Sequence, residues 1–146
     1  MFNRIKIFHL FLLFLPIITS GCISDGKTQE TTFSVKTSKS TNHGVPFRIV
    51  VKETDSIKFL YDDYQNIANE ANSQAENPSI LSSIFVIPGT TKKIKVTTKE
   101  NKSTGIYFLF TTPSEDWKEI VNNNDSHKVK VLLGENEIKS INVFGS

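Results

Sequence analysis

The chain has 146 residues, of which 38% are apolar, 22% charged and 10% aromatic, a composition typical of one globular domain. This composition excludes collagen-like, wholly disordered and multi-spanning membrane proteins. The 17 Lys and Arg residues nearly balance the 15 Asp and Glu residues, and Arg4 and Lys6 lie within the first 21 residues. The remainder is formally neutral, which disfavours nucleic-acid binding because contacts to several phosphates require a net positive surface.

The first 21 residues are typical of a secretory signal peptide. Arg4 and Lys6 precede an apolar run over residues 7–18, which is too short to span a hydrocarbon core of roughly 30 Å. The small residues that follow lead directly to Cys22 and resemble the bacterial lipobox, in which the Cys is acylated and the chain is cut before it. We therefore predict a lipoprotein signal peptide over residues 1–21 and lipidation at Cys22, where two or three acyl chains would give stable anchoring.

Cys22 is the only Cys of the chain, so no internal disulfide can form. A free buried thiol is the alternative interpretation. Ile23 rather than Asp follows Cys22, and under enterobacterial sorting rules this favours delivery to the outer membrane.

Polar residues without periodicity follow Cys22, and we predict a lipidated tether over residues 22–30. Apolar and polar residues then alternate over 33–37 and again over 47–52, which predicts two half-buried strands. The polar loop between them, residues 38–45, contains the sequence Asn-His-Gly.

The period changes to that of a helix over residues 56–71. Ser56 can cap its N-terminus. The predicted packing face comprises Ile57, Leu60, Tyr61, Tyr64, Ile67, Ala68 and Ala71. A stripe exposed for a partner or a bilayer is the alternative to a helix packed on a sheet.

Short strand patterns recur through the rest of the chain, and the run at 105–110 is apolar throughout, which predicts a strand covered on both faces. A Gly-containing turn after residue 133 predicts a terminal hairpin. The predicted strands lie at 80–87, 92–98, 105–110, 129–133 and 138–143. Together these elements predict a mainly β fold over residues 31–146, a mostly antiparallel β-sandwich with one inserted amphipathic helix.

The sequence lacks the patterns of an active site. It has no Gly-x-Ser-x-Gly motif, and His43 and His127 lie far apart in the chain without the paired spacing of metal ligands. The adjacent acidic pairs at 62–63 and 115–116 are predicted to be solvated. We therefore predict no catalytic residue, no metal, no cofactor and no enzymatic activity.

The order of these features resembles the TssJ family, the outer-membrane lipoproteins of type VI secretion systems. Order and spacing along the chain carry the resemblance, rather than any single motif. The matching segments are residues 46–52, 59–64, 85–94, 105–108 and 117–118.

The resemblance implies a transthyretin-like sandwich of two sheets, anchored in the outer membrane of a Gram-negative bacterium and facing the periplasm. It also implies an architectural role, in which the protein binds the periplasmic C-terminal region of the inner-membrane protein TssM. The loop at 38–45 is where the family is thought to meet that partner, and loops at strand ends are common binding sites. Asn42, His43 and Gly44 are accordingly the predicted partner-binding residues.

A periplasmic ligand- or peptide-binding β-sandwich lipoprotein, unrelated to secretion, is the alternative function. Such a module requires a concave site lined by aromatic side chains. Tyr107, Phe108 and Phe110 instead lie in the predicted core strand, which favours the architectural role.

Overall fold

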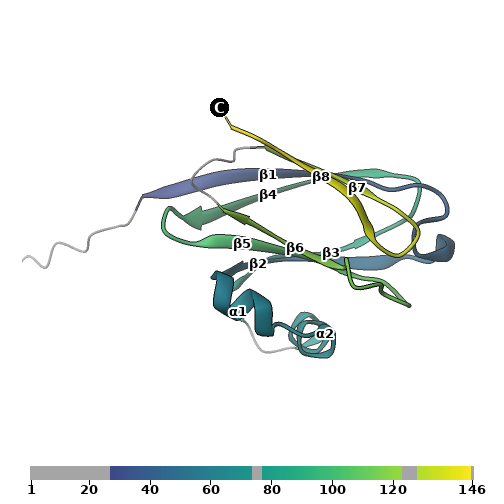
Figure 1. Ribbon diagram of the computed structural model, residues 1–146, viewed down its shortest axis with the longest axis horizontal. Coiled ribbons are helices and arrows are strands. Elements are labelled where there is room, and N and C mark those ends of the chain that lie inside the picture. Colours follow the sequence, from purple (N-terminus) through teal and green to yellow (C-terminus); the bar gives the residue numbers. More distant parts are fainter. Residues whose placement is uncertain (1–26, 74–76, 123–127, 146) are drawn as a thin grey trace, which may run out of the picture.

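The computed structural model describes residues 27–73, 77–122 and 128–145, whose elements form two packed β-sheets with helices outside one of them (Figure 1). The predicted signal peptide, Cys22 and His127 lie outside the described residues. Within the described ranges, no helix has the length and apolar character needed to cross a membrane.

Each sheet has four strands. The first sheet, in the order β4–β1–β7–β8, comprises β4 (Thr91–Lys99), β1 (Thr28–Lys36), β7 (Lys128–Leu133) and β8 (Ile138–Phe144). The second, in the order β3–β2–β5–β6, comprises β3 (Ile80–Val86), β2 (Phe47–Thr54), β5 (Ser103–Leu109) and β6 (Lys118–Asn122). The neighbouring strands are antiparallel except β1 and β7, which are parallel. The predicted mainly β sandwich and its terminal hairpin, β7–β8, are confirmed.

Strand β1 begins earlier than the sequence indicated. Residues 28–30, predicted to belong to the tether, pair with Thr97–Lys99 of β4. Their backbone groups complete the sheet although their side chains are polar, and Thr28 and Glu30 are exposed. An alternation of apolar side chains therefore could not reveal this part of the strand.

The core between the sheets follows the period of two that the strand patterns predicted. Phe33 and Val35 of β1 face Ile49 and Val51 of β2 across the sandwich, and all four are fully buried. Strand β5 is buried from Thr104 to Phe108, as its apolar run predicted.

A second apolar cluster lies on the outer face of β2 and β5, beneath the helices. It is formed by Val50, Ile67, Tyr107 and Trp117. The ring of Tyr107 lies over Gly105 so closely that a Cβ at that position would sit 2.6 Å from the phenolic oxygen. Only Gly allows this approach, because real Cβ contacts are not that short.

The single helix predicted over 56–71 is wrong. Two helices are present, α1 (Ser56–Tyr61) and α2 (Tyr64–Asn72). The carboxylate of Asp63 accepts the backbone N–H of Asn66 at 2.8 Å and begins α2, and Asp62 is extended. Asp favours caps over helix interiors because its side chain competes for backbone N–H groups, so the acidic pair interrupts the helix.

The break also changes which side of α1 is buried. Ile57, Leu60 and Tyr61 were predicted to pack on the sheet, but they are 70%, 76% and 82% exposed. Phe59 packs against the outer cluster instead, with its ring 5.8 Å from that of Tyr107. In α2 the prediction is confirmed, since Ile67 is fully buried.

The N-cap of α1 is likewise Asp55 rather than the predicted Ser56. Its carboxylate accepts the backbone N–H of Lys58 at 2.9 Å. This hydrogen bond is the main reason that the pKa of Asp55 lies below its usual value.

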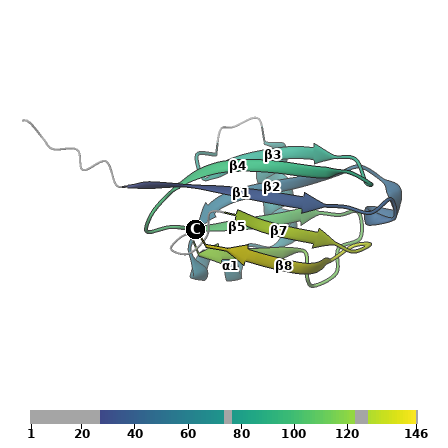
Figure 2. The ribbon, with the colours of Figure 1, turned by 90° about the horizontal axis from the view of Figure 1, so that it is seen from above.

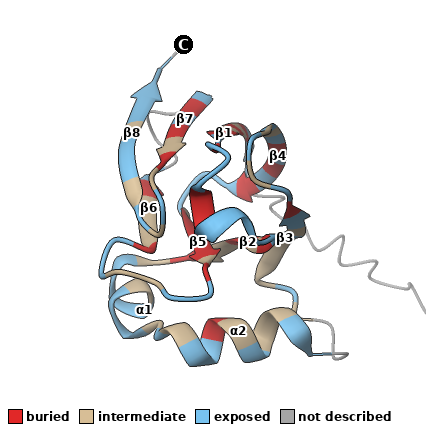
Figure 3. Ribbon diagram, turned by 90° about the vertical axis from the view of Figure 1, so that its right-hand side faces the viewer, coloured by how far each residue is buried: buried red, intermediate tan, exposed pale blue. Residues whose placement is uncertain are grey.

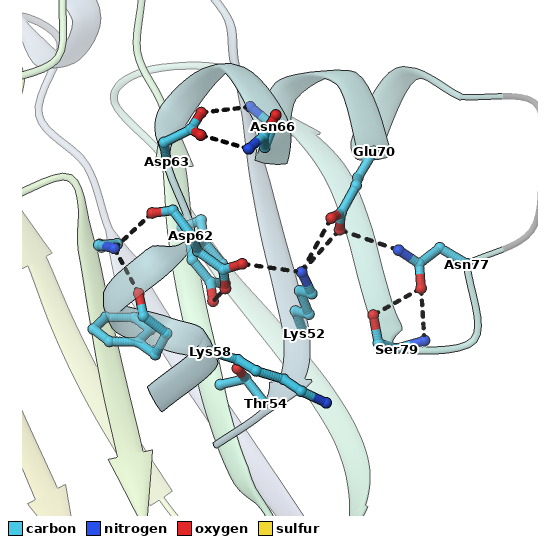
Figure 4. A network of polar contacts seen from close by, with 12 residues as sticks. Lys52, Thr54, Lys58, Asp62, Asp63, Asn66, Glu70, Asn77 and Ser79 are labelled. Atoms are coloured by element: carbon cyan, nitrogen blue, oxygen red, sulfur yellow. Dashed lines mark hydrogen bonds and ion pairs between the residues drawn. The ribbon is translucent and has the colours of Figure 1, made fainter. Parts of the chain in front are cut away.

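Asp62 fastens the helices to the sheet through polar contacts (Figure 4). One carboxylate oxygen accepts the Tyr107 hydroxyl at 2.5 Å, and the other lies 3.3 Å from Nζ of Lys52. Lys52 also lies 2.9 Å from Glu70 of α2. The acidic pair at 62–63 was predicted to be solvated, and this prediction is wrong for Asp62.

Burial affects the ionisable groups of this network. Desolvation, followed by the Asp62 hydrogen bond and charge, raises the pKa of Tyr107 well above its usual range. Nζ of Lys118 donates to the carbonyl oxygens of Phe59 and Asp62, both at 2.6 Å. Burial lowers the pKa of Lys118, although the charge of Asp62 opposes the shift.

Candidate functional site

Four loops meet at the end of the sandwich opposite the start of β1. They are the β1–β2 loop, the β3–β4 turn, the β5–β6 loop and the β7–β8 turn. The strand register places them together, because Lys36 pairs with both Thr91 and Leu132, and Phe47 pairs with Val86. We call this the loop end; Figure 3 looks onto it, and Figure 1 shows β1 beginning at the other end.

The predicted partner loop contains the short helix η1 (Thr41–Gly44) in an unusual backbone conformation. Asn42, His43 and Gly44 have φ values of +50°, +53° and +77°. Gly adopts this left-handed region freely, whereas residues with a side chain are uncommon there, Asn and His less so than most. The surrounding contacts must therefore impose the shape of this loop.

Asn42 supplies those contacts from a buried position. Its Nδ2 donates to the carbonyl oxygen of Val45 at 2.9 Å, and its Oδ1 accepts the backbone N–H of Thr111 at 2.7 Å. Its own backbone N–H donates to the carbonyl oxygen of Glu135. With a side chain that is 1% exposed, Asn42 joins three of the four loops and holds the site in shape, rather than offering a contact surface.

His43 does lie at the surface. Its Nδ1 is 3.1 Å from Oε1 of Glu135, and both side chains are more than half exposed. Gly44 is exposed beside it. The predicted set is therefore brought together by the structure, but only His43 presents a polar side chain to solvent.

Two apolar side chains extend this surface and were missed as site residues. Val45 is 50% exposed and Ile87 is 66% exposed, and both lie just beyond the Phe47–Val86 pair. The sequence could have indicated the exposure of Ile87. It directly follows the buried Val86 in an apolar run, and successive side chains of a strand point to opposite faces.

The exposed surface of the loop end combines apolar and charged side chains. Among the described residues, no group of three or more His, Cys, Asp and Glu side chains could hold a metal ion. The exposed set of His43, Val45, Ile87 and Glu135 combines apolar area with a polar rim, as in protein interfaces.

Comparisons with known proteins identify related chains. No curated protein sequence matches the chain. The family model described as "IglE, N-terminal domain" matches residues 48–133, from β2 to the end of β7.

Solved structures of the same fold include three from type VI secretion. The lipoprotein TssJ1 of Pseudomonas aeruginosa is 15% identical at a TM-score of 0.64, covering 82% of this chain and 99% of its own. Lip of Serratia marcescens, described as a membrane-bound component of the type VI secretion system, is 16% identical at a TM-score of 0.62, and the match covers 75% of this chain and 95% of Lip. A chain of a structure described as a type VI membrane complex is 12% identical at a TM-score of 0.60, and the match covers 81% of this chain and 99% of the other.

Proposed function

The chain belongs to the IglE N-terminal domain family, which is TssJ-like, and from this we propose that it is a lipid-anchored component of a type VI secretion membrane complex. Its role is architectural: it is anchored through Cys22 in the outer membrane, faces the periplasm, and binds the periplasmic part of a TssM-like inner-membrane protein. The fold neighbours are named as lipoproteins or membrane components of this system, which favours a structural role over an enzymatic one.

The observation that carries the proposal is the polarity of the sandwich. Strand β1 begins at one end, six residues after Cys22, and the exposed loop end lies at the other. A chain anchored at Cys22 therefore keeps the loop end free for a partner that reaches it from the periplasm. Asn42 holds the loops together, so the partner meets a surface that is already formed, which reduces the cost of ordering on binding.

The alternative, a ligand-binding sandwich, finds no support in the aromatic run at residues 107–110. Tyr107, Phe108 and Phe110 are fully buried in the two apolar clusters. They cannot stack against a bound sugar or peptide, so the architectural role is the better proposal.

The function is tested in cells that lack the wild-type gene and carry Cys22→Ser. We expect the variant protein to leave the membrane fraction, to take up no labelled fatty acid, and to support no secretion through the type VI system. Ser24→Ala serves as the matched control, because it lies beside Cys22 and leaves the acylated thiol in place. Fatty-acid labelling of the Cys22→Ser protein, or undiminished secretion, would contradict the proposal.

A further inference from the structure

The outer face of the first sheet carries a groove between two rows of lysines. Alternation places Lys93 and Lys95 of β4 and Lys128 and Lys130 of β7 on this face, because their neighbours Ile94 and Val129 are buried. Strand β1 lies between these strands, and Figure 2 shows the sheet from this side.

The strand register forms two regular rungs across the three strands. Thr32 pairs with Lys95 on one side and with Lys128 on the other, and Ser34 pairs in the same way with Lys93 and Lys130. Hydroxyl side chains thus form the floor and lysines the walls of a hollow of about 790 Å³. We call this hollow the lysine groove.

Positive charge dominates the sheet that bears the groove. Lys36 and Lys99 lie on the same face and are exposed. The only acidic residue in the four strands is Glu30, which lies 3.1 Å from Lys95. A chain that is nearly neutral as a whole therefore has one strongly basic face.

An exposed aromatic side chain accompanies these lysines. Phe144, the last residue of β8, is 44% exposed, and its ring centroid lies 4.9 Å from Nζ of Lys130. Phe144 pairs with Lys128 of β7, toward the end of the sheet where β1 begins. Helices that lie in a membrane interface likewise combine lysines with apolar side chains such as Phe.

We propose that the lysine groove and Phe144 dock this sheet onto the anionic phospholipid surface in which the protein is anchored. The inference rests on the proposed anchor at Cys22. The six residues from Cys22 to Thr28 can span at most roughly 20 Å, so the strand that forms the floor of the groove is held close to the bilayer. Lysines within a Debye length of anionic headgroups are attracted to them.

This orientation agrees with the rest of the molecule. The helices lie on the opposite side of the sandwich, and the loops lie at its far end (Figures 1 and 2). Docking the first sheet therefore leaves the loop end accessible to a partner.

The test uses the unacylated domain, residues 23–146, which contains all the described elements and both apolar clusters. Its binding is measured by sedimentation with vesicles of equal parts phosphatidylglycerol and phosphatidylcholine, and with vesicles of phosphatidylcholine alone. We expect binding to the anionic vesicles only, weakening as salt is raised.

Two double variants of equal charge locate the surface. Lys93→Gln with Lys128→Gln should weaken binding to anionic vesicles at least tenfold. Lys39→Gln with Lys58→Gln removes the same charge from exposed positions outside the first sheet and should bind nearly as the wild type does. Phe144→Ala should weaken binding by a smaller factor.

Equal binding by the two double variants, equal binding to neutral vesicles, or a preference for polyglutamate over anionic vesicles would overturn the proposal. The last result would assign the groove to an acidic protein. Because the assay contains neither acyl chain nor partner, its failure leaves the proposed secretion role untouched. Conversely, if Cys22 is not acylated in cells, the vesicle assay still measures the groove directly.

Discussion

Two regions of the molecule are stabilised by different kinds of contact: the core between the two sheets, and the layer of helices outside the second sheet. Between the sheets, side chains from alternating strand positions form one apolar core. Outside, a small apolar cluster around Ile67 is supplemented by the hydrogen bonds and ion pairs of Asp62 and Lys52. The first arrangement follows from local periodicity, whereas the second depends on partners far apart in the chain.

The largest expected effect lies between the sheets. Phe108→Ala removes a fully buried ring and should lower the free energy of unfolding by about 3–5 kcal/mol, because the core around it cannot collapse fully. Denaturant unfolding of the soluble domain measures this loss. Phe85→Ala, whose ring is 66% exposed, is the control and should cost far less; equal losses would contradict the assigned core.

A comparison within the helix layer should separate α2 from α1. Ile67→Ala should cost about 2–5 kcal/mol, since its side chain is fully buried. Leu60→Ala, at a position 76% exposed, should change stability by only about 0.5 kcal/mol. Thermal or denaturant unfolding of both variants tests this order, and a larger loss for Leu60→Ala than for Ile67→Ala would contradict the burial assigned to the two helices.

The polar contacts of the helix layer should contribute less than either core. Asp62→Ala removes the carboxylate that accepts the Tyr107 hydroxyl and one of the two ion-pair partners of Lys52, at a cost of about 1–3 kcal/mol. Asp116→Ala removes an exposed acidic side chain and should be nearly neutral. If the two variants unfold at the same denaturant concentration, Asp62 does not fasten the helices.

The same contrast explains which parts of the fold the sequence predicted. Strands with one buried face were found because each buried side chain recurs at every second position. The cap at Asp63 is a local contact with Asn66 and was overlooked. The contacts of Asp62 could not be predicted, because they depend on Lys52 and Tyr107, which lie on separate strands. Helical spacing alone could not show that a different side of α1 is buried.

For the 38–45 loop, the sequence indicated an exposed loop at the strand ends but not the burial of its individual side chains. The loop at 38–45 does lie at an exposed end, yet Asn42 is buried because its partners, Thr111 and Glu135, come from distant loops. The lysine groove escaped notice for a related reason. Whole-chain charge balance cannot show which lysines share a face, and only strand register brings those of β4 and β7 together.

The most direct test of the proposed function is a titration of the soluble domain, residues 23–146, against the periplasmic fragment of a TssM-like protein. His43→Ala with Ile87→Ser alters exposed side chains of the loop end while leaving Asn42 in place. This variant should weaken binding at least tenfold, about 1.4 kcal/mol. Leu60→Ser with Tyr61→Ala, on the exposed side of α1, should bind as the wild type does. Unchanged affinity for the loop-end variant, or loss of binding only in the α1 variant, would contradict the assignment of the loop end as the partner site.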